Sequence, residues 1–110
     1  VLIIKIKNIN ILIILIMSTY KIYKAQFNNA KKLQVTIKPS ENKHKKLDVY
    51  LKDKKIASIG SIRYGDYHNF IETKGKEFAE TRRRLYKIRH NKTRNIVGSK
   101  SYYADRILWD

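Results

Sequence analysis

The sequence predicts a small α+β domain, in which a three- to four-stranded antiparallel sheet is packed by one long basic helix and a short C-terminal helix. Two patterns indicate this class. Apolar and polar residues alternate in the first half of the domain, which is the period of half-buried strands. Apolar residues then recur at helical spacing within a strongly cationic segment. With 110 residues, the chain has room for one domain with a modest core.

Residues 1–16 differ in kind from the rest, because they are almost wholly aliphatic and of low complexity. A transmembrane helix needs about 20 apolar residues, and two lysines and two asparagines interrupt this run. A secretory signal would need a small-residue cleavage site, which residues 18–21 do not offer. We favour a third interpretation, in which AT-rich sequence upstream of a start at Met17 has been translated. We therefore expect 1–16 to be a low-complexity, non-native extension and 17–110 to be the single basic domain.

The first strands are predicted from alternation. The pattern runs through residues 20–27 and 31–38, and it ends at Pro39 and Ser40. In the second segment the apolar residues on one side are Leu33, Val35 and Ile37.

An antiparallel hairpin is expected next. Residues 47–51 and 56–62 alternate on either side of a short polar connection, Lys52-Asp53-Lys54-Lys55. We expect these two segments to pair, with residues 33–37 as a third strand. Gly60 is expected to mark the end or a bulge of the last strand.

Helices are predicted for the second half of the domain. Asp66 can cap a short helical turn. A longer helix over residues 76–91 is expected to pack on the sheet through an apolar stripe formed by Phe78, Leu85 and Ile88, together with Thr81. Ser99 or Ser101 can cap a last short helix, which is too apolar to be a free tail. Its docking residues are Tyr102, Tyr103, Ile107, Leu108 and Trp109.

The charge of the chain indicates a polyanionic partner. Lys and Arg number 25 against 9 Asp and Glu, so the formal net charge is +16. Such a charge causes self-repulsion unless a polyanion is present, which makes nucleic acid the leading partner and an anionic membrane surface the second. An AT-rich genome that favours Lys codons is the alternative explanation, against which the Arg82-Arg83-Arg84 triplet argues.

The chain has no cysteine, and His44, His68 and His90 lack metal-ligand spacing, so we expect no metal and no cofactor.

A basic run is the main candidate for nucleic-acid contacts. Seven Lys or Arg residues and no acid lie between Arg82 and Arg94. Cations in a line along a helix suit the phosphates of a duplex or strand, without reading base sequence. The alternative is a solvated helix face whose arginines pair with acids of the chain. The residues assigned to phosphate contacts are Arg82, Arg83, Lys87, Arg89, Lys92 and Arg94 on the helix and directly after it, and Lys52, Lys54 and Lys55 at the hairpin tip.

Aromatic residues are interleaved with the basic ones. Tyr64 and Tyr67 are the pair proposed to stack on unpaired bases, although core packing is the commoner role for such residues.

Catalysis has little support, because the sequence has no nucleophile elbow and no glycine-rich phosphate loop. Asp66, Glu72 and Asp105 are better explained as caps and ion pairs than as a carboxylate cluster. We therefore expect a protein that is not an enzyme.

Several short motifs in the second half of the chain occur in a fixed order. They are Ser58-Ile59-Gly60, Tyr64-Gly65-Asp66-Tyr67, the Arg-rich segment with Arg89-His90, Gly98-Ser99 and Ile107-Leu108-Trp109. In this ordered set the chain resembles a family of small, basic, functionally uncharacterised proteins of large nucleocytoplasmic DNA viruses, the giant viruses of protists and algae. The resemblance implies a viral origin, in the virion or the viral factory of the host cytoplasm, and no known activity.

The expected function is therefore non-enzymatic binding of nucleic acid, with viral DNA favoured over RNA. The rival expectation is a structural or minor capsid-associated protein of the virion, whose basic face binds acidic viral proteins. Membrane attachment through residues 1–16 is the third and least favoured expectation.

Overall fold

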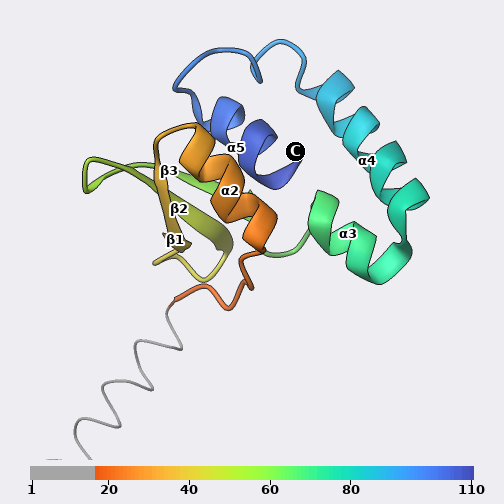
Figure 1. Cartoon of the computed structure of the whole chain (residues 1–110), viewed down its shortest axis with the longest axis horizontal. Coiled ribbons are helices and arrows are strands. Elements are labelled where there is room, and N and C mark those ends of the chain that lie inside the picture. The colour runs from red at the N-terminus through yellow and green to blue at the C-terminus, as the bar shows by residue number, and fades with distance from the viewer. Residues whose placement is uncertain (1–16) are drawn as a thin grey trace, which may run out of the picture.

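The computed structural model describes residues 17–110, so the expectation about residues 1–16 lies outside the described residues. The α+β fold is confirmed. The described elements are α2 (Lys24–Lys32), β1 (Thr36–Pro39), β2 (Lys45–Leu51), β3 (Lys54–Ser61), α3 (Tyr67–Lys74), α4 (Lys76–Arg89) and α5 (Lys100–Leu108). Figure 1 shows the sheet at one side of the molecule and α3 and α4 at the other, with α2 and α5 between them.

The three strands form one antiparallel sheet in the order β1-β2-β3. The predicted hairpin is confirmed, because β2 and β3 pair with Leu47 opposite Ile59. Ile37 of β1 lies opposite Val49 of β2. These four side chains are at most 3% exposed, and alternation has therefore placed the apolar face of each strand in the core.

The segment before β1 differs from the expectation of a strand in residues 20–27. Residues from Lys24 onward form α2, which begins where the side chain of Gln26 accepts a hydrogen bond of 2.9 Å from the backbone N–H of Tyr23. Gln26 and Ala30 are both buried, four residues apart, on the inner face of this helix. The third strand starts only at Thr36, because Gln34 reverses the chain with a positive φ of 60°.

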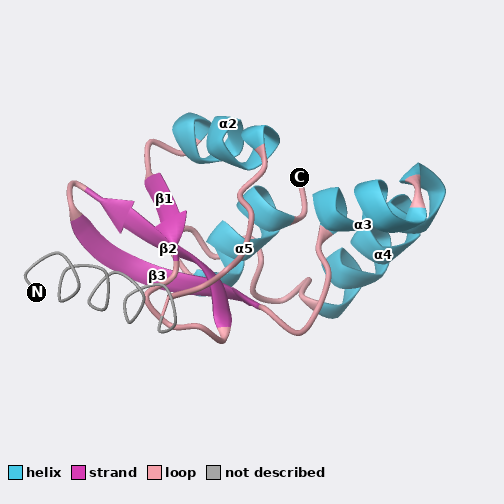
Figure 2. Cartoon of the chain, turned by 90° about the horizontal axis from the view of Figure 1, so that it is seen from below, coloured by secondary structure: helices cyan, strands magenta, loops and turns pink. Residues whose placement is uncertain are grey.

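Helices α2 and α5 cover one face of the sheet (Figure 2). As predicted, Ser99 caps α5, since its side chain accepts a hydrogen bond from the backbone N–H of Tyr102. Ile107 and Leu108 are buried in the core against β3, which confirms the docking of the C-terminal segment.

The long basic helix α4 is present, and Asp66 caps α3 as predicted. Helix α4, however, packs on α3 rather than on the sheet. The two helices join at Gly75, whose φ of 92° reverses the chain. Ala79 therefore faces inward and is fully buried. The predicted sheet-facing stripe lies largely in solvent, because Phe78, Leu85 and Ile88 are 43%, 45% and 63% exposed.

Candidate nucleic-acid interface

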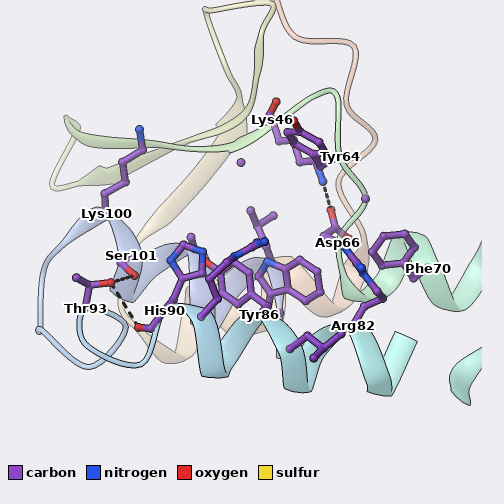
Figure 3. A pocket seen from close by; sticks show the side chains of 18 of the residues that line it. Lys46, Tyr64, Asp66, Phe70, Arg82, Tyr86, His90, Thr93, Lys100 and Ser101 are labelled. Atoms are coloured by element: carbon purple, nitrogen blue, oxygen red, sulfur yellow. Dashed lines mark hydrogen bonds and ion pairs between the residues drawn. The ribbon is translucent and has the colours of Figure 1, made fainter. Parts of the chain in front are cut away.

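A cavity of about 1050 Å³ opens between α4, the end of β3 and α5. Figure 3 shows the side chains of α4 along one wall, with Tyr64 and Lys100 on the opposite side. The hollow exists because α4 is held away from the sheet by α3, while α5 lies directly on β3. We call this cavity the groove.

Three stacked rings form the aromatic wall of the groove. The ring of Tyr86 lies 4.5 Å from that of Trp109 at an interplanar angle of 13°. The ring of His90 also stacks on Tyr86, with a distance of 4.3 Å between the ring centroids and an interplanar angle of 30°. Tyr86 lies in the last turns of α4 and His90 is its C-terminal capping residue, so the spacing of four residues places them on one face. Trp109 follows α5, and the stack therefore joins the two helices.

Two glycines permit the close approach of backbone and side chains at the edge of the groove. A Cβ atom on Gly60 would lie 2.8 Å from Leu108 Cδ1, and its φ is 76°. A Cβ atom on Gly65 would lie 2.5 Å from Phe70 Cζ. Both positions therefore require glycine for packing. Gly60 falls inside β3, one residue before its end, in agreement with the expected place for this residue.

The rim of the groove is cationic. Arg82, Arg89 and Lys100 line it, and all three are exposed. Asp66 is the only acid among the described residues that line the cavity. Its carboxylate is 1% exposed and lies 2.8 Å from the Nζ of Lys46. The negative charge at this site is therefore neutralised internally.

Ion pairs divide the predicted phosphate-binding residues into two groups. Arg83 pairs with Glu80 at 2.7 Å and lies over the ring of Tyr67 at 4.0 Å. Lys87 and Arg94 both pair with Asp105, at 3.3 Å and 3.6 Å. These three cations are therefore engaged by acids of the protein itself. For them the alternative interpretation applies, in which cations of the run pair with acids of the chain.

The second group is free. Within residues 17–110, no carboxylate lies within 4.0 Å of the charged groups of Arg82, Arg84, Arg89 or Lys92. All four side chains are exposed. Of these four, Arg82 and Arg89 line the groove. Arg84 lines a second pocket, beside Arg83 and Lys87, and Lys92 lies in the loop after α4.

The hairpin tip carries the other predicted phosphate contacts. Lys52 is exposed in the turn between β2 and β3, and Lys54 is exposed at the first position of β3. Lys55 is engaged by Glu41 at 3.4 Å and by Asp48 at 3.8 Å, and the charge of Asp48 raises the pKa of this lysine. In Figure 1 this turn lies at the opposite end of the molecule from α4, so the two predicted groups do not form one patch.

The two predicted stacking tyrosines have different surroundings. Tyr64 is 72% exposed and lines the groove, opposite α4. Tyr67 is 7% exposed, and its hydroxyl donates a hydrogen bond of 2.7 Å to Glu80. Its ring is also covered by Arg83, so the structure leaves Tyr64 alone as an accessible ring of this pair.

Sequence reasoning missed four functional candidates of the groove, Tyr86, His90, Lys100 and Trp109. The spacing of Tyr86 and His90 was a usable signal, because residues at positions i and i+4 share a helix face. No local pattern places Trp109 or Lys100 beside them. Those two contacts depend on how α5 returns to α4.

Burial shifts the pKa values of groups around the groove. Burial lowers the pKa of His90, and the neighbouring charge of Arg89 acts in the same direction, so both favour the uncharged imidazole. Burial, with the charge of Asp105, raises the pKa of Tyr86 to about 12. The pKa of Lys100 is lowered by burial and by the ammonium group of Lys45.

Comparison of the chain with protein-family models, with curated proteins and with solved structures finds no match. Among the described helices, none combines the length and apolar character needed to cross a membrane. Residues 17–110 also contain no group of three or more His, Asp or Glu side chains arranged to hold a metal ion. Asp66 and Asp105 do not form a carboxylate cluster, since the first caps α3 and the second binds cations of α4 and of the loop after it.

Proposed function

We propose that this protein binds nucleic acid without enzymatic activity, through phosphate contacts from α4, and that its natural ligand is viral DNA. The observation that supports this most directly is the group of four exposed cations without internal carboxylate partners, Arg82, Arg84, Arg89 and Lys92. Their charge is part of a net charge of +16 on the whole chain.

The spacing of these cations fits a nucleic-acid backbone. Arg82 and Arg89 are seven residues apart, which corresponds to about 10 Å along a helix that rises 1.5 Å per residue. One strand of a duplex carries a phosphate about every 3.4 Å of its axis. A backbone that follows α4 therefore passes these two guanidinium groups within about three phosphates.

Salt-dependent binding tests the proposal. Fluorescence anisotropy would be measured for residues 17–110 and for the full chain with labelled duplex DNA, single-stranded DNA and duplex RNA. We expect a steep fall of log K with log salt, because bound cations release counterions from the phosphates. The double variant Arg82→Gln, Arg89→Gln should reduce the slope by roughly 1.4 to 1.8, which is the loss of two phosphate contacts.

A matched control separates local contacts from net charge. Lys31→Gln with Lys32→Gln removes the same charge from the exposed last turn of α2. If the α4 variant and this control lose equal affinity, binding is a diffuse effect of charge and the assignment to α4 fails. If no ligand binds at low salt, nucleic-acid binding itself is wrong.

A structural role in the virion is the second candidate. Ile88 and Val97 are 63% and 80% exposed, and contact with a protein partner would remove these apolar side chains from water. In that case the α4 face would bind an acidic viral protein. Replacement of both residues by Asp should then abolish incorporation into particles while leaving DNA affinity intact. Unchanged incorporation would count against this role.

A further inference from the structure

We propose that the groove binds unpaired bases of a single strand, which lie between Tyr64 and the stacked rings of α4 while the phosphates meet Arg82, Arg89 and Lys100. This inference rests on the proposed function and adds the form of nucleic acid that it prefers. It is carried by the shape of the groove, its aromatic wall and the sign of its charge.

The aromatic wall is recessed, which selects for unpaired bases. In a duplex the faces of the bases are covered by their neighbours and cannot enter a cavity between two helices. An unpaired base has a free face, and stacking on aromatic side chains is the usual way in which single strands are held. At about 1050 Å³, the groove is at the upper end of the volumes of small-ligand sites. It therefore has room for bases together with their backbone.

Two ring surfaces are available on opposite sides of the groove. His90 is at the end of the three-ring stack and is half-buried. Tyr64 is largely exposed on the opposite side (Figure 3). Burial lowers the pKa of His90, which favours the uncharged form of its ring. The groove thus presents one accessible ring from each of its two walls.

The charges around the groove favour a phosphate backbone. Arg82, Arg89 and Lys100 line the rim, and the only lining acid within the described residues is already paired with Lys46. Burial, and after it the nearby ammonium group of Lys45, lowers the pKa of Lys100, so this lysine lies beside a like charge. A bound phosphate would relieve that repulsion. An apolar protein segment would leave these cations without a partner.

An oligonucleotide that lacks bases is the decisive probe. Three 12-nucleotide strands would be compared by anisotropy and by intrinsic fluorescence: oligothymidine, oligouridine and an abasic DNA strand with the same phosphates. Trp109 is the single tryptophan of the chain and is stacked on Tyr86, so its emission reports on the groove. We expect oligothymidine to bind at least about tenfold more tightly than the abasic strand and to change the emission of Trp109. Oligouridine shows whether DNA and RNA differ.

Variants of the exposed rings complete the test. Tyr64→Ala and His90→Ala should each reduce the preference for bases over the abasic strand by about fivefold or more. Phe27→Ala is the matched control, because Phe27 is a half-exposed aromatic residue on α2 outside the groove, and it should leave the preference unchanged. These side chains are accessible, and the variants are expected to fold.

The outcomes separate the two proposals. Equal affinity for oligothymidine and the abasic strand, with a steep salt dependence, would overturn base binding in the groove and leave phosphate binding intact. Tighter binding of duplex DNA than of either single strand would do the same. Failure of all strands to bind at low salt would overturn both proposals.

Discussion

The carboxylate of Asp105 lies 3.3 Å from the Nζ of Lys87, and this contact ties α5 to the cationic helix α4. Asp105 also meets Arg94 at 3.6 Å and Arg106 at 3.4 Å, although it is only 1% exposed. One buried acid thus holds three cations from two helices and the loop between them. Together with the stack of Tyr86 on Trp109, this acid connects α4 to the C-terminal segment.

Replacement of Asp105 by Asn should destabilise the fold. The amide keeps the shape of the side chain and removes its charge, which leaves Lys87 and Arg94 without their common partner. Since these cations are about one quarter exposed, we expect a loss of about 2–3 kcal/mol in the free energy of unfolding, less than for a fully buried pair. Urea unfolding followed by circular dichroism would measure it.

Asp53→Asn is the control for this change. Asp53 is an exposed acid in the hairpin turn and makes no ion pair within 4.0 Å in residues 17–110. Its replacement should change the unfolding free energy by less than about 0.5 kcal/mol. Equal effects of the two variants would show that Asp105 does not tie the helices together.

Gly60→Ala and Gly98→Ala should differ in cost, although both residues have positive φ angles, of 76° and 83°. A Cβ atom on Gly98 meets nothing within 4 Å, so only the backbone conformation opposes alanine there. A Cβ atom on Gly60 would be 2.8 Å from Leu108. We expect a loss of about 1 kcal/mol for Gly98→Ala and of about 2–4 kcal/mol for Gly60→Ala, measured by urea unfolding. A larger effect at Gly98 would contradict the close contact of β3 and α5.

The stability of the sheet should depend on pH through Asp48. Burial alone would raise the pKa of this carboxyl, but hydrogen bonds from the Ser58 hydroxyl, the Glu41 backbone N–H and the Ser40 hydroxyl outweigh it, and the pKa is lowered. A lowered pKa in the folded state contributes stability that is present above the unfolded value of about 3.9. This stability is lost as the pH falls through the folded pKa.

The test is a comparison of the protein with the Asp48→Asn variant in urea unfolding between pH 7 and pH 3. At pH 7 the variant should be less stable, because the three hydrogen bonds to a charged acceptor are weakened. The difference should narrow as the pH falls below about 4, where protonation removes the same charge from the unaltered protein. A difference that is constant over this range would show that the charge of Asp48 does not matter.

Binding of nucleic acid should strengthen in acid through His90. Burial and Arg89 lower the pKa of His90, so this group gains its proton below its ordinary value of about 6.5. The imidazolium adds one positive charge to the groove, and bound phosphate favours that charged form. We expect the affinity for single-stranded DNA to rise by roughly fivefold as the pH falls from 7.5 to 5.

His90→Phe keeps an aromatic ring on Tyr86 and cannot take up a proton, so most of this rise should disappear. His44→Phe is the control, because His44 is exposed in the loop before β2 and does not line the groove. That variant should retain the full pH dependence. If both variants behave like the unaltered protein, another group is responsible for the rise.

Several elements were predictable from local sequence because their causes are local. Alternating apolar residues placed Leu47 and Ile59 in a hairpin, and the capping side chains of Asp66 and Ser99 marked the beginnings of α3 and α5. The segment over α2 was misassigned, because a few alternating residues near Tyr20 do not distinguish a strand from the approach to a helix. The capping contact of Gln26 and the burial of Ala30 decided in favour of the helix.

The basic run was also recognised in the sequence. Which of its cations pair with acids of the protein and which remain free was not predicted. Arg82 and Arg83 are neighbours in sequence, yet Arg83 pairs with Glu80 and Arg82 faces the groove. Helical spacing predicts which cations share a face, but it does not show which face meets Asp105.

The sequence by itself determined the charge, the α+β class and the positions of most strands and helices, since these depend on composition and on periods of two and 3.6 residues. Only the tertiary structure decided that α4 packs on α3, that Trp109 stacks on Tyr86 and that two of the free cations, Arg82 and Arg89, border a groove. The physical reason is that these contacts join segments far apart in the chain, where packing and burial, rather than local pattern, select one arrangement.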